Sequence, residues 1–226
     1  MKQIITLFSA VLVLLTATTS CDIFEGGESK DDAVDLGLSV KWATCNLGAT
    51  SPEQPGGFYA WGETTPKTVF TKENYKYIKI EKSSYGDPIT VYTKYYPETD
   101  KTALDPEDDA ARVKLGGKWR MPTMAEFQEL IDNCTWTLTT RGGVDGFEVK
   151  SKVNENSIFL PLTGLYGPLG SYNPDGATMS YKDHGFIWIS NMNANQNWNG
   201  YYKKGKPGGW WGVLREQGAP IRPVSD

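Results

Sequence analysis

Residues 116–131 read GGKWRMPTMAEFQELI, and this stretch contains the clearest helix start in the chain. Thr123 can cap a helix by accepting a backbone N–H bond, while Glu126 can accept a bond from the Thr123 amide, which is the capping-box arrangement. Apolar residues then follow at helical spacing and form one stripe: Phe127, Leu130 and Ile131. The stretch therefore predicts one main helix over about 123–133 whose apolar stripe packs against a sheet.

Upstream of this helix the sequence predicts short strands and loops. Residues 33–48 alternate apolar and polar positions around a glycine, which indicates two short strands joined by a tight turn. Residues 58–63 form an aromatic, strand-like patch. The Tyr-rich segments 75–80 and 89–96 indicate either a β-hairpin that protrudes from the core or a long loop. Asp105, followed by a proline, is expected to cap one or two helical turns within 104–113.

Downstream of the helix, six further runs have the composition of strands: 135–140, 146–151, 157–162, 185–190, 210–214 and 219–224. The first two are joined by residues 141–145. Residues 164–176 are rich in Gly and Pro, and residues 191–199 are rich in Asn, so both are predicted to be surface loops of the kind that carry function. The sequence shows no internal repeat at a fixed period, which argues against a propeller or a solenoid.

The N-terminus has the pattern of a targeting segment. Lys2 precedes an apolar run over 4–15, and small residues lead to Cys21. A cysteine in this place resembles the lipobox of bacterial lipoproteins, in which that cysteine is acylated, for instance with palmitate, and becomes the first mature residue. The alternative is an ordinary secretory signal. The expected organisation is a signal peptide over 1–20, a flexible tether over 21–33, and a single domain over 34–226 with an irregular insertion at about 64–110.

Composition limits the possible partners. The chain of 226 residues carries a net charge of −4, and it shows no basic patch of the kind that nucleic acids require. Eight Trp and twelve Tyr exceed what a plain core needs, and they are the raw material of a sugar-binding or protein-binding surface. We therefore expect a glycan or protein ligand and no nucleic acid.

Two cysteines remain after Cys21, namely Cys45 and Cys134. In an oxidising envelope compartment two such thiols favour a disulfide, and Cys45–Cys134 is the candidate pair. The alternative is that both are buried, small hydrophobic side chains. A disulfide would tie the N-terminal strands to the end of the main helix.

The late loops hold the best candidate ligand surface, because aromatic faces stack on sugars and Asn amides offer both a donor and an acceptor. Trp211 belongs to the same late region, but Trp188 and Trp211 lie in strand-like runs and are the two residues most expected in the core. The candidate ligand-binding residues are Tyr166, Tyr172, Asn193, Asn195, Trp198, Tyr201, Tyr202 and Trp210, with Asn191 in the same region.

Catalytic and metal-binding patterns are weak. His184 is the only histidine, from which we expect neither a His-based triad nor a multi-histidine zinc site. Acidic residues at 105–109 lack the spacing of an EF-hand loop and are expected to form a solvated helical turn. Arg120 and Arg222 are expected to bind carboxylates or carbonyls within the fold. No catalytic residue, metal or cofactor is therefore expected.

Five ordered blocks together resemble a known family: DLGLSVKWA at 35–43, YAWGE at 59–63, WRMPT at 119–123, NSIFLP at 156–161 and IRPV at 221–224. They are similar to the Fibrobacter succinogenes major paralogous domain, which lipoproteins of gut Bacteroidetes carry. The blocks around 120–127 and 222–224 also resemble formylglycine-generating and sulfatase-modifying enzymes. The resemblance implies an α+β, C-type-lectin-like domain with short, twisted, mostly antiparallel strands, one main helix and long ordered loops.

The chain departs from the enzymes and from the calcium-dependent lectins in this resemblance. No cysteine follows Cys134 to form the copper-holding pair of the enzymes, and Trp198-Asn199-Gly200 lacks the acid of a calcium-dependent lectin site. We therefore expect a noncatalytic adhesin or binding module, held in the outer membrane by a lipid on Cys21 and exposed at the cell surface. The alternatives are an enzyme of the sulfatase-modifying type, an unrecognised hydrolase, or a structural subunit of a surface appendage.

Overall fold

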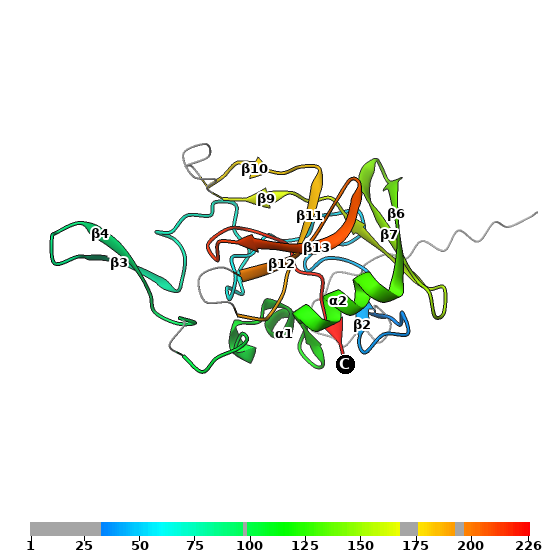
Figure 1. The fold of residues 1–226 in the computed structure, drawn as a ribbon, viewed down its shortest axis with the longest axis horizontal. Coiled ribbons are helices and arrows are strands. Elements are labelled where there is room, and N and C mark those ends of the chain that lie inside the picture. Colours follow the sequence, from blue (N-terminus) through cyan, green and yellow to red (C-terminus); the bar gives the residue numbers. More distant parts are fainter. Residues whose placement is uncertain (1–32, 97–98, 168–175, 193–196) are drawn as a thin grey trace, which may run out of the picture.

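The computed structural model describes residues 33–96, 99–167, 176–192 and 197–226. Over these residues the chain forms small antiparallel sheets and two α-helices, an α+β arrangement in which strands predominate (Figure 1). The helices are α1 (Ala110–Leu115) and α2 (Met124–Asn133), preceded by the 3-10 turn η1 (Pro106–Asp108). The strands are β1 (Ala33–Val34), β2 (Lys41–Ala43), β3 (Ile78–Lys82), β4 (Pro88–Tyr92), β5 (Trp119–Arg120), β6 (Cys134–Arg141), β7 (Val144–Ser151), β8 (Ser157–Pro161), β9 (Leu165–Tyr166), β10 (Met179–Ser180), β11 (His184–Trp188), β12 (Asn197–Lys203), β13 (Lys206–Val213) and β14 (Val224–Ser225).

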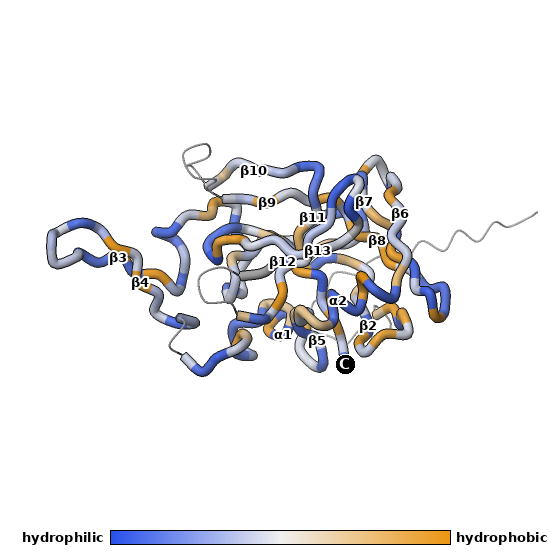
Figure 2. Tube along the Cα trace, viewed as in Figure 1, coloured by the Kyte–Doolittle hydropathy of each residue, from blue (hydrophilic) through white to orange (hydrophobic). Residues whose placement is uncertain are grey.

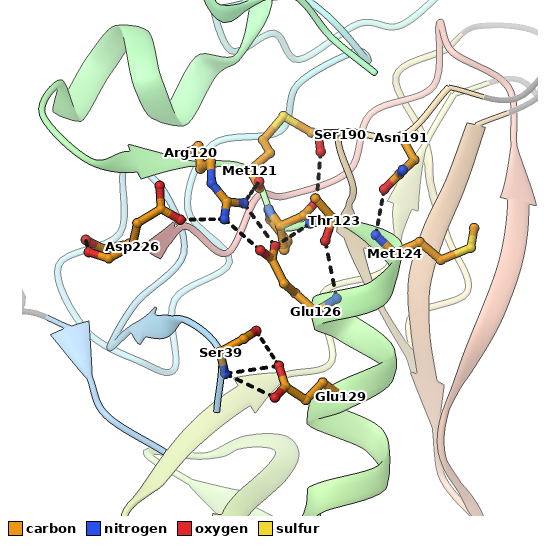
Figure 3. Close-up of polar contacts among 12 residues, drawn as sticks. Ser39, Arg120, Met121, Thr123, Met124, Glu126, Glu129, Ser190, Asn191 and Asp226 are labelled. Atoms are coloured by element: carbon orange, nitrogen blue, oxygen red, sulfur yellow. Dashed lines mark hydrogen bonds and ion pairs between the residues drawn. The ribbon is translucent and has the colours of Figure 1, made fainter. Parts of the chain in front are cut away.

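Helix α2 begins at the predicted capping box. The Thr123 hydroxyl accepts a bond from the Glu126 amide, and the Glu126 carboxylate accepts a bond of 2.7 Å from the Thr123 amide. Arg120 donates two hydrogen bonds to the same carboxylate, at 2.6 and 2.9 Å, and a third to Asp226 (Figure 3). The prediction that Glu126 caps the helix and that Arg120 binds carboxylates within the fold is confirmed.

The two ends of the domain meet in one sheet with the order β1-β2-β14-β5. Arg222, just before β14, is fully buried, and its guanidinium donates hydrogen bonds to backbone carbonyls and to one amide oxygen. The acceptors are Ala43 O, Thr44 O, Phe159 O and Asn46 Oδ1. This side chain joins the N-terminal segment to β8, as expected of an arginine that binds carbonyls.

The first three strands after α2 follow the sequence closely, whereas the predicted strand over 219–224 is wrong, because only Val224 of that run lies in a strand, β14. β6, β7 and β8 form an antiparallel sheet, and Gly142 and Gly143 make its first turn with positive φ angles of 57° and 82°. Positive φ at both turn positions is the geometry of a two-residue hairpin turn, and glycine adopts it without strain. The hairpin is therefore tighter than the five-residue connection expected from the sequence.

The sheet β11-β12-β13 lies between two apolar cores. Phe186, Trp188 and Tyr201 point into one core, together with Trp61 and further aromatic residues. Ile187 and Tyr202 point into the other, which also contains Phe127 and Leu130 of α2. Because side chains alternate between the faces of a strand, neighbouring residues of this sheet serve different cores.

Residues 64–105, here named the insertion, lie in the chain between β2 and η1. β3 and β4 form an antiparallel hairpin that extends away from the rest of the molecule (Figure 1). Of the two sequence interpretations, the hairpin is thus correct. Phe70, Tyr75, Tyr77 and Tyr95 near its base are buried in the core.

Several expectations from the sequence were wrong. Residues 58–63 form no strand, only an isolated bridge between Tyr59 and Ala219. Asp105 precedes η1 but makes no side-chain cap, whereas Asp109 caps α1 by accepting bonds from the Ala111 and Arg112 amides. The polar segment 191–199 already enters β12 at Asn197, because a strand can form from polar residues when its neighbours supply the pairing.

Candidate functional site

Tyr201 and Trp211 lie on the same face of the sheet β11-β12-β13, and Trp211, on the edge strand β13, reaches the protein surface. Phe186 pairs with Tyr201 across β11 and β12, and Asn199 pairs with Trp211 across β12 and β13. The opposite face packs on α2, where a Cβ atom at Gly200 would lie 2.6 Å from the Phe127 ring. The alternation of the strands therefore presents Trp211 away from the helix.

Four aromatic side chains form what we name the aromatic surface: Tyr181, His184, Tyr201 and Trp211. The ring centroids are 5.1 Å apart for Tyr201 and Trp211, 5.8 Å for Tyr181 and Trp211, and 5.3 Å for His184 and Tyr201. Trp211 is 39% exposed, whereas Tyr201 is buried beneath it. Phe186 supports the cluster from below at 5.6 Å from Tyr201. The Trp211 ring is therefore exposed to solvent on one side and packed against aromatic neighbours on the other.

Charged groups border these rings. Asp183 Oδ1 lies 2.6 Å from His184 Nδ1, and the hydrogen bond with His184 lowers the pKa of the exposed Asp183 carboxyl. The Lys206 ammonium lies 6.0 Å from the Tyr201 ring. The aromatic surface thus has both a carboxylate acceptor and an ammonium donor at its border.

Tyr181 adopts an unusual backbone conformation, with a φ of 53°. Left-handed backbone is uncommon for a bulky residue and costs on the order of 1 kcal/mol. A hydrogen bond of 2.9 Å from the His184 amide to the Tyr181 carbonyl closes the turn. The turn places the Tyr181 ring against Trp211, so the strain is associated with the assembly of the aromatic surface.

Asn199 contributes an unsatisfied amide beside Trp211. It is fully buried, and neither its Nδ2 nor its Oδ1 has a hydrogen-bond partner. In the sheet it lies between Trp188 on β11 and Trp211 on β13. Most buried polar groups are hydrogen-bonded, so this amide is a polar group that the fold itself does not use.

The structure separates the residues that the sequence grouped as a ligand surface. Tyr201 and Tyr202 are both buried, and the Tyr202 hydroxyl donates to the Pro161 carbonyl at 2.9 Å, so neither is an exposed binding residue as predicted. Trp210 is partly buried on α2, with its Nε1 3.2 Å from Gln128 Oε1. Tyr166 packs edge-on against Phe58 at 4.7 Å and is not part of the aromatic surface.

Other predicted residues are either structural or outside the described part of the chain. Asn191 accepts a bond of 2.6 Å from the Met124 amide and so caps α2 (Figure 3). Cys21, Tyr172, Asn193 and Asn195, and the side chain of Trp198, lie outside the described residues. Two residues of the aromatic surface were not predicted as binding residues from the sequence. Trp211 was expected in the core, and Tyr181 has no sequence feature that marks it beyond being aromatic.

The cysteine prediction was wrong. Cys134 is a free, buried cysteine at the start of β6, so it forms no disulfide with Cys45. Burial raises the pKa of the Cys134 thiol to about 11, which keeps it protonated at neutral pH. The side chain belongs to the core beside Phe127 and Leu130 and behaves as a small apolar group.

The acidic residues near η1 hold a lysine. Asp105, Glu107 and Asp108 place carboxylate oxygens within 4.8 Å of one another. The Lys94 ammonium lies 2.7 Å from Asp105, 3.6 Å from Glu107 and 2.5 Å from Asp108. Lys101 also pairs with Asp105 at 2.5 Å and Lys76 with Asp108 at 3.1 Å, so three lysines balance the three carboxylates and the cluster is an ion-pair network of the fold.

One shallow pocket of about 240 Å³ lies on the sheet β6-β7-β8. Its charged residues are already paired, Arg141 with Glu53 and Glu148 with the Ser157 hydroxyl. In the part of the chain that the structure describes, no hydroxyl or thiol hydrogen-bonds to the His184 ring, so the His184–Asp183 pair lacks an adjacent nucleophile.

No family model, curated protein or solved structure matches this chain. Within the described ranges, no helix has both the length and the apolar character needed to cross a membrane.

Proposed function

We propose that this protein is a noncatalytic, lipid-anchored binding protein of the outer membrane, exposed at the cell surface, and that its aromatic surface binds glycans. The supporting observation is the exposed ring of Trp211, which packed aromatic neighbours hold at one edge of a sheet. In this proposal the α+β arrangement is of the C-type-lectin-like kind that the sequence blocks resemble, and Cys21 carries the lipid.

The chemistry of the aromatic surface suits a sugar. The C–H faces of a pyranose ring stack on an exposed indole, and burying both faces removes apolar area from water. The hydroxyl groups of the same sugar can donate to Asp183 and accept from Lys206 at the border of the surface. A rigid ring loses little conformational entropy on binding, because its neighbours already fix it.

A noncatalytic role is supported by how the polar groups are used. Glu126, Asp108 and Asp109 are bound by Arg120, lysines or backbone amides within the fold. The His184 ring is bound to Asp183 at Nδ1.

The test is a screen of residues 33–226 against arrayed glycans and mucin, followed by calorimetry on any glycan bound. Binding is expected for the native domain and is expected to be lost in Trp211→Ala, because the stacking face is removed. Tyr85→Ala is the matched control, since Tyr85 is 92% exposed but lies at the tip of the β3–β4 hairpin. Equal binding by Trp211→Ala would show that the aromatic surface is not the site.

The lipid anchor has its own test. Cells that express the full chain are fed an alkyne-bearing palmitate analogue, and the chain is compared with a Cys21→Ser variant. Label on the native chain and none on the variant is expected. Labelling of neither would favour an ordinary secretory signal, and equal labelling of both would show that the lipid is not on Cys21. The glycan screen uses residues 33–226, so its result does not depend on this outcome.

A further inference from the structure

The β3–β4 hairpin has an open, partly apolar surface far from the aromatic surface. Ile80 is 48% exposed and Ile89 is 42% exposed, and they lie on opposite faces of the hairpin because they occupy alternating register positions. Figure 2 shows apolar stretches on both strands between hydrophilic segments. A lone two-stranded hairpin is marginally stable in water, so a partner strand would stabilise it.

The hydrogen bonding of the hairpin shows which backbone groups point outward. The Thr93 amide donates to Tyr77 O at 2.9 Å, and the Ser83 amide donates to Asp87 O at 2.7 Å. In an antiparallel pair the bonded positions alternate, so the N–H and C=O groups of Ile80 and Lys82 point away from β4. β3 therefore has an outer edge that can pair with another strand.

The charges on β3 are complementary to those of a second β3 that runs antiparallel to it. Lys79 and Glu81 flank Ile80, both are exposed, and neither has an ion-pair partner among the described residues. If a second β3 lies antiparallel with the two Ile80 residues opposite each other, Lys79 of each strand faces Glu81 of the other. Opposite charges in directly facing positions stabilise a strand pair.

We propose that the outer edge of β3 pairs antiparallel with β3 of a second copy of this chain, and that the resulting four-stranded sheet β4-β3-β3-β4 forms a symmetric dimer. The two Ile80 residues exchange backbone hydrogen bonds, and their side chains lie side by side on one face. Lys79 and the partner's Glu81 meet on the other face. The hairpin extends away from the body, by which we mean the described residues outside the insertion, so two copies can meet there without contact between their bodies (Figure 1).

The charges also select a single register. Moving the strands to the next hydrogen-bonding register in one direction places Lys79 opposite Lys79, and moving them in the other direction places Glu81 opposite Glu81. Like charges in facing positions are destabilising. The β4 edge is less suitable because Pro88 has no N–H to donate, and because Tyr92 is partly buried with the Arg215 guanidinium 4.9 Å from its ring.

Sedimentation velocity of the full chain over a range of concentrations tests the proposal. The native chain is expected to show a monomer–dimer equilibrium. Lys79→Glu and Glu81→Lys are each expected to weaken the dimer by about tenfold, because both facing pairs become repulsive. The double variant Lys79→Glu, Glu81→Lys is expected to restore the native dimer, since it exchanges the two charges.

Three outcomes would overturn the proposal: a native chain that stays monomeric at every concentration, single variants that dimerise as the native chain does, or a double variant that does not recover. Circular dichroism controls for folding, and since both residues are exposed the thermal transition is expected to be unchanged. Binding of an unrelated extended peptide to a monomeric native chain would indicate strand addition by a different partner.

Discussion

The body of the domain and the insertion use polar groups in opposite ways. In the body, Arg222 is fully buried and donates to acceptors from two distant segments of the chain. In the hairpin of the insertion, the side chains of β3 are exposed along most of the strand. The body therefore buries this charged group and satisfies it with its own backbone, whereas the hairpin leaves its groups open to partners.

The base of the insertion is nevertheless bound to the body through two buried charged residues, Asp108 and Arg215. Asp108 accepts hydrogen bonds from Lys94 at 2.5 Å, from the Tyr95 hydroxyl at 2.7 Å and from Lys76 at 3.1 Å. From the other side, Arg215 donates to the Tyr95 carbonyl and lies 4.9 Å from the Tyr92 ring. The comparison shows that an exposed hairpin can be positioned by its base without a core of its own.

Arg222→Ala should produce the largest loss of stability, and it tests the body alone. The substitution leaves four acceptors without their donor in a site closed to water. Burial lowers the pKa of Arg222 to about 10, so the native side chain is charged at neutral pH. We expect a loss of about 3–5 kcal/mol in the free energy of unfolding, measured by urea denaturation. A loss under about 1 kcal/mol would contradict the role given to this residue.

Asp108→Asn should act on the insertion more than on the body. The neutral amide weakens the bonds from Lys94 and Lys76, and we expect a loss of about 2 kcal/mol. Hydrogen exchange should increase over the insertion and stay unchanged in α2 and β12. Uniform exchange across both regions would show that the insertion and the body unfold together.

The same anchor predicts a dependence on pH. Burial raises the pKa of Asp108, but hydrogen bonds from Lys94 and its neighbours outweigh burial and hold the pKa far below its usual range. A lowered pKa in the folded state contributes stability above the unfolded pKa of about 3.9. Protection of the insertion from hydrogen exchange should therefore be constant near neutral pH and decline as the pH falls below about 4. In Asp108→Asn this decline should be smaller.

The parts of the fold that the sequence predicted are those governed by local chemistry. The capping box at Thr123 and Glu126 involves residues three apart, so the pattern alone identifies it. The hairpin β6–β7 has two adjacent glycines at its turn, and the alternation of its strands is regular. Short-range rules suffice for such elements.

The candidate site depended on information that a single sequence does not contain. Tyr201 and Tyr202 are adjacent and chemically alike, and only the position of the sheet between two cores explains why both are buried. Trp211 is in a strand-like run, which favoured a place in the core, but its side chain is exposed at the protein surface. The Cys134 prediction failed for a related reason, because the distance between two thiols is a property of the tertiary fold.

Asn199→Leu should stabilise the body. The native amide is buried without a partner, so an apolar side chain of similar size removes a desolvation cost and leaves no other group unsatisfied. We expect a gain of about 1 kcal/mol in the free energy of unfolding, measured by urea denaturation. A clear loss would mean that the amide has a partner in the folded protein, and calorimetry with a bound glycan would show whether that partner is the ligand.

Trp211→Ala should have the smallest effect on stability and so separates binding from folding. Trp211 is 39% exposed, whereas Trp210, its neighbour on the opposite face, is partly buried with its ring 5.4 Å from Phe127. We expect a loss of about 1 kcal/mol or less for Trp211→Ala and about 3 kcal/mol for Trp210→Ala in thermal denaturation. The reverse order would place Trp211 in the core, and any loss of glycan binding in that variant would then be a consequence of unfolding. If the expected order holds, a loss of binding in Trp211→Ala reports the removal of a contact surface from an intact domain.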